Sequence, residues 1–114
     1  MSDIETIAKQ ILSKGKGILA ADESTGTMTK RLSSVNVEST SENRLKFRET
    51  LFSADGIKNY IGGIILYDET IKQKSSSGKT IPELIKSFGS IPGIKVDTGA
   101  KKLAGSTDEK ITEG

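Results

Sequence analysis

Three short apolar runs, separated by segments with helical patterns, constrain the fold of this chain more than any other feature. They span residues 17–22 (GILAAD), 61–67 (IGGIILY) and 93–97 (GIKVD), and each ends in an acid or is followed directly by one. Runs of this length and character predict β-strands, and we expect the first to be buried on both faces. Strands that alternate with helices predict an α/β fold with a parallel sheet. Three strands cannot close an eight-stranded barrel within 114 residues.

The helical patterns lie before and between these strands. Residues 3–13 place apolar side chains three and four positions apart, and Ser2 and Glu5 have the spacing of a capping box. After the first strand, a polar turn leads into a short helix that ends at Leu32.

Two later helices are predicted over residues 42–54 and 82–88. Ser41 is the expected N-cap of the first, whose expected apolar members are Leu45, Phe47, Leu51, Phe52 and Ala54. Pro82 fits the first turn of the second, where its missing N–H costs nothing. Residues 98–114 have little apolar periodicity and predict a loop, so its lysines (Lys101, Lys102 and Lys110) are expected to be solvated.

Composition excludes several classes of site and protein. The chain has no Cys and no His, so disulfides, cysteine zinc sites and histidine catalysis are excluded, and any chemistry rests on Asp, Glu, Lys, Tyr, Ser or Thr. A net charge of +2 without a basic block argues against a nucleic-acid partner. No apolar run approaches the length of a membrane span, and the N-terminus has no signal-peptide pattern.

The residues that follow the first strand form the most informative motif. Ligands of parallel α/β folds bind at the carboxyl ends of strands, and this end carries Asp22, Ser24 and Thr27 before a helix. Hydroxyls and backbone N–H groups at such a turn can bind a phosphate, or can bond only their own backbone. Asp22 either caps or pairs locally, or it orients substrate hydroxyls and moves a proton. Neither nucleotide-binding glycine fingerprint is present.

Charged residues also end the other two strands. Lys95 and Asp97 are two residues apart, so their side chains point to the same side of a strand. A lysine in an apolar strand needs a partner: it forms an ion pair with Asp22 or Asp97, binds a phosphate, or serves as a lysine for covalent chemistry. Asp68 and Glu69 are either a catalytic acid pair or acids that cap the next turn.

Four segments resemble class I fructose-bisphosphate aldolases. The long motif GKGILAADESTGTMTKRL at 15–32 is similar to the first strand and phosphate loop of that family, and the segments at 42–55, 61–74 and 93–105 follow in the same order. The resemblance covers nearly the whole chain. It implies that residues 1–114 are an N-terminal fragment, about the first third, of a single TIM-barrel aldolase domain. That fragment would hold the first three βα units of a (β/α)8 barrel.

The resemblance also implies an activity. Class I aldolases are cytoplasmic lyases of glycolysis and gluconeogenesis, commonly tetramers, that cleave fructose 1,6-bisphosphate reversibly to dihydroxyacetone phosphate and glyceraldehyde 3-phosphate. They use a Schiff base on a lysine and need no metal or other cofactor. That lysine lies on a later strand, so we expect this chain alone to be inactive. The alternatives are a non-catalytic phosphate-binding or interaction module, and a related class I aldolase for another sugar phosphate.

Site residues carry over from the family by position. The acid that matches Asp22 lies near the substrate hydroxyls and the reactive lysine, and the hydroxyls that match Ser24 and Thr27 hold the 6-phosphate. The residues that match Arg31 and Lys95 lie by the same phosphate. Asp22 and Lys95 are therefore the predicted catalytic residues, and Lys95 is also a predicted phosphate ligand. Because its strand edges lack partners, we expect the chain alone to be marginally stable and either to aggregate or to associate with itself or with a complementary fragment.

Overall fold

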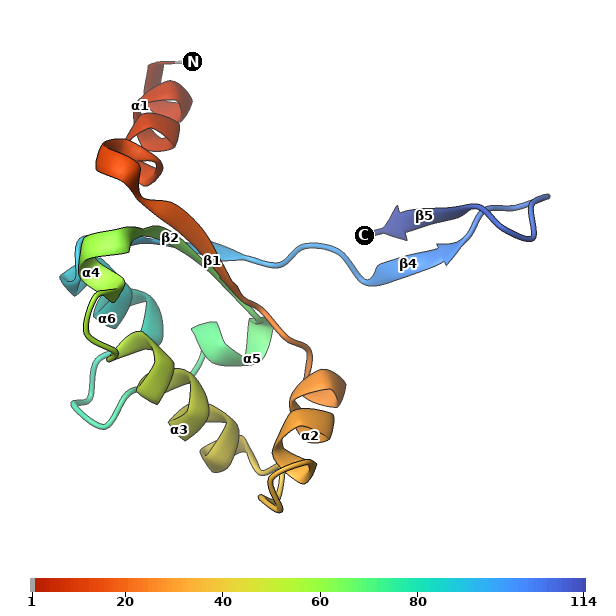
Figure 1. Ribbon diagram of the computed structural model, residues 1–114, viewed down its shortest axis with the longest axis horizontal. Coiled ribbons are helices and arrows are strands. Elements are labelled where there is room, and N and C mark those ends of the chain that lie inside the picture. Colours follow the sequence, from red (N-terminus) through yellow and green to blue (C-terminus); the bar gives the residue numbers. More distant parts are fainter. Residues whose placement is uncertain (1) are drawn as a thin grey trace.

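A three-stranded parallel sheet forms the centre of the molecule, as the sequence predicted. The computed structural model describes residues 2–114, without the side chains of Ser2 and Lys14. The strands are β1 (Gly17–Ala21), β2 (Ile61–Leu66) and β3 (Ile91–Ile94), in the order β1-β2-β3 (Figure 1). The helices are α1 (Ser2–Ile11), α2 (Thr25–Ser33), α3 (Ser41–Phe52), α4 (Ile57–Tyr60), α5 (Asp68–Ile71) and α6 (Ile81–Ser87), with a short 3-10 helix at Ser13–Gly15.

The core lies between the sheet and the helices α3 and α6. The central cluster of buried apolar side chains comes from these elements, and Met28 and Leu32 of α2 are buried as well; the cluster consists of Ala21, Phe52, Ile64, Leu66, Ile81 and Ile85. Helix α6 begins with a complete capping box, because the Thr80 side chain accepts from the Glu83 N–H while the Glu83 carboxylate accepts from the Thr80 N–H. Pro82 lies in the first turn as predicted. These caps fix the helix that covers β3. The capping box that the sequence predicts for Ser2 and Glu5 falls on a side chain, that of Ser2, outside the described ones.

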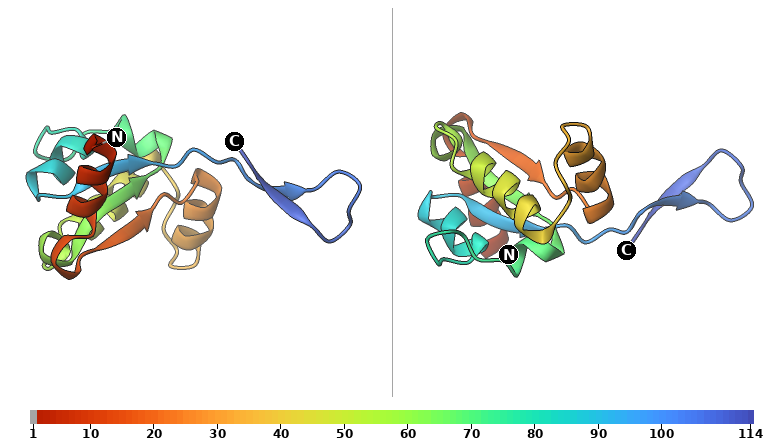
Figure 2. Two further views of the ribbon diagram at one scale, coloured as in Figure 1. Left: turned by 90° about the horizontal axis from the view of Figure 1, so that it is seen from above. Right: turned by 90° about the horizontal axis from the view of Figure 1, so that it is seen from below.

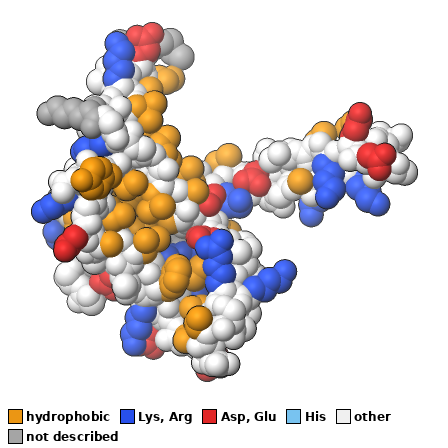
Figure 3. All heavy atoms as spheres, viewed as in Figure 1, with side chains coloured by type: hydrophobic (Ala, Val, Ile, Leu, Met, Phe, Trp, Pro, Cys, Tyr) orange, Lys and Arg blue, Asp and Glu red, His pale blue; other side chains and the backbone are white. Residues whose placement is uncertain are grey.

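Strand β1 is more exposed than predicted. Only Ala21 is buried, and the side chain of Ile18 is 52% exposed. The exposed Ile18 and Ala20 alternate with Leu19 and Ala21, which pack in or against the core, so only one face of β1 is covered; β1 is also an edge strand of this sheet. Hydrophobic side chains gather along α1 and across the adjacent sheet (Figure 3). An apolar cavity of about 190 Å³ opens on that face, between Ile11, Ile18 and the strands β2 and β3.

The inward face of α3 differs from the prediction in part: Phe52 is buried and Leu45 and Leu51 pack beside the core as expected, but two arginines are buried with them. Its buried residues are Arg44, Arg48 and Phe52, while Phe47 is 40% exposed and Ala54 lies outside the helix. Residues spaced by four lie on one helix face, so two arginines share the buried stripe with one phenylalanine. The N-cap is Thr40, whose hydroxyl accepts from the Asn43 N–H, rather than the predicted Ser41.

The third strand ends earlier than predicted. Its register with β2 runs from Gly63↔Ile91 to Leu66↔Ile94, so β2 ends where β3 ends. Lys95 and Asp97 therefore lie just beyond the strand. The Lys95 N–H still donates to the Leu66 carbonyl at 2.9 Å, which continues the ladder by one bond.

The C-terminal segment is not the predicted loop. Strands β4 (Gly99–Lys102) and β5 (Lys110–Glu113) form an antiparallel hairpin that extends away from the rest of the molecule (Figures 1 and 2). Its strands are short and polar, so they show no clear alternation in the sequence. Lys101, Lys102 and Lys110 are exposed there, as predicted.

Candidate functional site

The residues that follow the three parallel strands meet around one open cavity of about 520 Å³. It is lined by Ser24, Tyr67, Asp68, Lys95, Val96, Asp97, Thr98 and Gly99. The lining therefore comes from the carboxyl end of each strand, the position at which parallel α/β sheets bind ligands. The sequence predicted this grouping from the strand-end rule.

Lys95 lies between two carboxylates. Its Nζ is 3.1 Å from Asp97 Oδ1 and 3.7 Å from Asp22 Oδ2, and about a quarter of the Lys95 and Asp22 side chains and a third of the Asp97 side chain are exposed. The hydrogen bond from Lys95 lowers the pKa of the Asp97 carboxyl, helped by the Gly99 N–H, and the same bond to Asp97 raises the pKa of Lys95. Lys95 therefore remains an ammonium at neutral pH. The ion pair that the sequence left as one alternative is present with both acids.

Ser24 and Thr27 form the N-terminus of α2. Ser24 is the N-cap: its Oγ is 3.4 Å from the Thr27 N–H and donates to Thr27 Oγ1 at 3.2 Å. Both distances are long for hydrogen bonds of these types, so the cap is weak. The hydroxyls thus bond their own turn, which is the local alternative raised by the sequence, and an anion with stronger acceptors can compete for them.

Arg31 points to a different partner from the one predicted for it. Its Nη1 donates to Glu23 Oε1 at 2.7 Å, its side chain is 56% exposed, and it does not line the cavity of Lys95. Its role as a phosphate ligand stays a prediction.

Asp68 and Glu69 do not act together. Asp68 forms an exposed ion pair with Lys72, one turn later, at 2.8 Å. Glu69 accepts two hydrogen bonds from the guanidinium of Arg44, from Nε and Nη2, each at 2.8 Å. The bond from Arg44 lowers the pKa of the Glu69 carboxyl. The two neighbouring acids therefore have separate structural partners.

Sequence reasoning missed the buried guanidiniums behind the site. Arg48 is fully buried, and its Nη2 donates to the main-chain carbonyl of Glu23, directly between Asp22 and Ser24. The one available signal was the spacing of Arg44, Arg48 and Phe52, which places both arginines on the face of a residue expected in the core.

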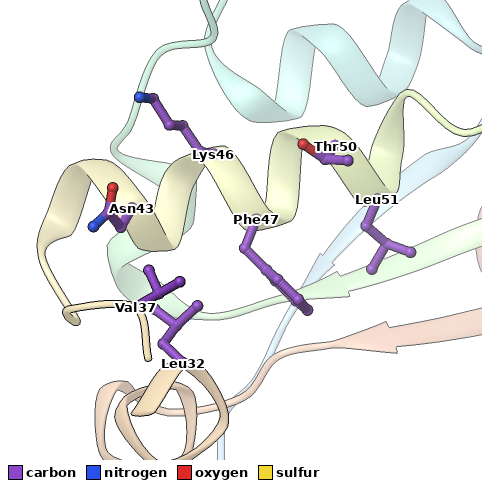
Figure 4. A pocket seen from close by; sticks show the side chains of 7 residues that line it. All are labelled: Leu32, Val37, Asn43, Lys46, Phe47, Thr50 and Leu51. Carbon is purple, nitrogen blue, oxygen red and sulfur yellow. The ribbon is translucent and has the colours of Figure 1, made fainter. Parts of the chain in front are cut away.

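A second concave surface lies between α2 and α3, with a volume of about 480 Å³ (Figure 4). It is lined by Leu32, Val37, Asn43, Lys46, Phe47, Thr50 and Leu51. Its surface is largely apolar, and it shares no residue with the cavity of Lys95. Within residues 2–114, no group of three or more acidic side chains is placed to bind a metal ion. No helix in that range is long and apolar enough to cross a membrane.

Comparison with known proteins identifies the family. A family model described as fructose-bisphosphate aldolase class-I matches residues 3–114. The chain is 54% identical over 112 residues to fructose-bisphosphate aldolase B of Gallus gallus, covering 97% of this chain and 31% of the relative. It is 52% identical over 107 residues to the cytoplasmic isozyme 1 of Pisum sativum, covering 94% of this chain and 30% of the relative.

A solved structure agrees with these sequence matches. Fructose-bisphosphate aldolase of Plasmodium falciparum, solved in complex with TRAP and a small molecule inhibitor, is similar with a TM-score of 0.91 at 42% identity. The similarity covers 99% of this chain and 33% of that structure, so the chain spans about a third of its length. The parallel strands of this chain are consistent with part of the barrel of that family. This chain belongs to the class I fructose-bisphosphate aldolases.

Proposed function

We propose that this chain forms the phosphate-binding wall of a Schiff-base aldolase that cleaves fructose 1,6-bisphosphate to dihydroxyacetone phosphate and glyceraldehyde 3-phosphate. The observation that carries the proposal is the position of Lys95, at the strand ends, between Asp22 and Asp97 and on the same cavity as Ser24. An ammonium has three N–H donors, so Lys95 can serve both carboxylates and still donate to a phosphate oxygen.

The remaining residues have complementary roles in this proposal. The hydroxyls of Ser24 and Thr27 exchange their weak mutual bonds for bonds to the 6-phosphate, and the N-terminal end of α2 favours that negative charge. The Asp22 carboxylate accepts a hydrogen bond from a substrate hydroxyl and helps to move a proton. Arg31 approaches the phosphate only if it leaves Glu23.

Lys95 itself does not suit the nucleophilic step. A Schiff base forms from a neutral amine, whereas both carboxylates favour the ammonium form of Lys95. Resemblance to the family implies that the reacting lysine lies on a later strand, outside these 114 residues, so we expect the chain alone to be inactive. Asp22, Lys95 and Asp97 together carry one more negative than positive charge, so the chain alone binds phosphate weakly.

A chimaera tests the proposal. This chain replaces the matched portion of Gallus gallus aldolase B, to which it is 54% identical. We expect the chimaera to cleave fructose 1,6-bisphosphate, and Lys95→Met to raise its KM by about tenfold or more, the effect of losing a charge-assisted bond. Lys101→Met, on the exposed hairpin, is the matched control. A folded chimaera without cleavage, or cleavage by the 114-residue chain alone, overturns the proposal.

Two alternatives have separate tests, the first with the chimaera and the second with the 114-residue chain. A higher ratio of fructose 1-phosphate cleavage to fructose 1,6-bisphosphate cleavage than in the unmodified Gallus gallus enzyme favours an aldolase with another sugar phosphate. The chain alone also contains the complete Ser24–Lys95 cavity, which favours a non-catalytic phosphate-binding module. Titration of that chain with inorganic phosphate, followed by NMR, tests this alternative. Unchanged amide signals from Ser24 to Thr27 exclude a phosphate-binding module.

The assembly and compartment follow from the family in this proposal. We expect a tetramer in the cytoplasm. The name of the Pisum sativum relative, a cytoplasmic isozyme, supports the compartment. Analytical ultracentrifugation of the chimaera, and fluorescence microscopy of a tagged chain, test the two statements separately.

A further inference from the structure

Arg48 is an unusual residue to bury. Its side chain is fully buried on the inward face of α3, one turn before Phe52. Burial lowers the pKa of Arg48, and the carboxylates of Glu23 and Glu69 act in the opposite direction. Removing a guanidinium from water is costly, and an apolar residue at such a position usually stabilises a fold as well or better.

The hydrogen bonds of Arg48 do not satisfy the whole guanidinium. Its Nη2 donates to the Glu23 carbonyl, while Nε and Nη1 have no hydrogen-bond acceptor among residues 2–114. Nη1 lies 3.7 Å from Glu69 Oε1, and the group stacks 5.9 Å from the centre of the Tyr67 ring. A guanidinium with two unpaired nitrogen atoms contributes less to stability than its burial costs, so the role of Arg48 is best explained by the group that its one hydrogen bond holds.

That bond holds the peptide between two candidate site residues. Glu23 separates Asp22 from Ser24, and a fixed Glu23 carbonyl restricts the orientation of both neighbours. From the other side, Arg31 holds the Glu23 carboxylate at 2.7 Å. The segment is therefore tied through its backbone from inside and through its side chain from outside.

Glu69 fixes the direction of the guanidinium. Arg44 holds the Glu69 carboxylate with two bonds of 2.8 Å, and this carboxylate faces Nη1 of Arg48. Glu69 follows β2, whereas Glu23 follows β1. The two arginines on α3 thus connect the turns after two neighbouring strands.

We propose that Arg48 is a positioning residue: it holds the Asp22–Ser24 peptide from beneath, in the orientation that binds the sugar phosphate, and Glu69 orients its guanidinium. This inference takes only the identity of the ligand, a sugar phosphate, from the proposed function. Arg48 touches no substrate and acts through the backbone of Glu23.

Kinetics of the chimaera provide the first test. We expect Arg48→Met to raise the KM for fructose 1,6-bisphosphate by about tenfold, with a smaller change in kcat. Arg48→Lys keeps the charge and can reach one of the two acceptors, so it recovers part of the loss. Lys46→Met, on the exposed side of the same helix, is the matched control and leaves KM unchanged. Equal falls in kcat for Arg48→Met and Arg48→Lys, with KM unchanged, overturn the inference.

Hydrogen exchange of the 114-residue chain provides a test without activity. We expect Arg48→Met to speed exchange at the amides of residues 23–28 by at least tenfold relative to amides of α6, while Lys46→Met does not. A uniform increase over the whole chain means that Arg48 only stabilises the fold, which overturns the inference. Because this measurement needs no substrate, a chimaera without cleavage contradicts the proposed function and leaves the positioning test decisive.

Discussion

The ammonium of Lys95 lies 3.1 Å from the carboxylate of Asp97, although neither residue belongs to a strand. The β2–β3 register ends one residue earlier, and a single further bond to the Leu66 carbonyl continues the extended backbone through Lys95. This places the two side chains on one side, together with Asp22 from the next-but-one strand. A cation and two anions thus meet where the chain leaves the sheet.

The pH dependence of stability reports this pair. The pKa of Lys95 is raised above its ordinary 10.5, so its contribution is complete below that value and is lost as the pH rises through the folded-state pKa. The pKa of Asp97 is lowered below 3.8, so its contribution is present above that value and is lost as the pH falls. We expect wild type to exceed Asp97→Asn in urea stability between these limits and to converge with it outside them. A constant difference from pH 2 to 12 contradicts the pairing.

A glycine fixes the contact between α1 and β2. A Cβ at Gly62 would lie 1.7 Å from the Ile11 carbonyl oxygen, which belongs to rigid backbone. We expect Gly62→Ala to lower the free energy of unfolding by about 1–3 kcal/mol because α1 must move. Gly26→Ala is the control: its Cβ meets nothing within 4 Å, and alanine in α2 stabilises by up to about 1 kcal/mol. Urea unfolding measures both, and equal effects contradict the contact.

The free edge of β1 predicts self-association. Ile18 is 52% exposed on a strand that pairs on one side only, and exposed apolar edges recruit further strands. We expect Ile18→Lys to increase the monomer fraction of the 114-residue chain in analytical ultracentrifugation. Val35→Lys, at an exposed residue outside the strands, serves as the control. Association that persists unchanged in Ile18→Lys means that the edge is not the contact.

The sequence predicted the sheet and the main helices because hydrophobic periodicity reports burial by apolar residues. This prediction failed where the buried residues are polar or charged. On α3 the apolar pattern correctly placed Phe52 in the core and Leu45 and Leu51 beside it, but it did not predict that Arg44 and Arg48 are buried as well. The expected burial of β1 on both faces failed because only the face that carries Leu19 and Ala21 packs against the core, while Ile18 and Ala20 on the other face are exposed.

The candidate site was predictable to the extent that it follows from strand ends. Asp22, Lys95 and Asp97 come together because parallel strands end at one edge of the sheet, which the order of elements already implies. The bond from Arg48 to the Glu23 carbonyl was not predictable, because it depends on how α3 rotates against the sheet. The spacing of Arg44, Arg48 and Phe52 places the two arginines on one face of the helix, but it does not tell which carbonyl group Arg48 reaches.

Ser24 offers a way to separate a helix cap from a phosphate ligand. Its Oγ caps α2 weakly, so Ser24→Ala should lower the free energy of unfolding by about 1 kcal/mol, whereas Ser24→Gly should lower it by only a few tenths. Both variants lack the hydroxyl, so in the chimaera both should raise the KM for fructose 1,6-bisphosphate by about tenfold. Thr27→Ser keeps a hydroxyl at its position and should match wild type. If Ser24→Gly retains the wild-type KM while Ser24→Ala does not, the hydroxyl only caps the helix. An equal rise in both assigns it to the phosphate, since stability and binding then change independently.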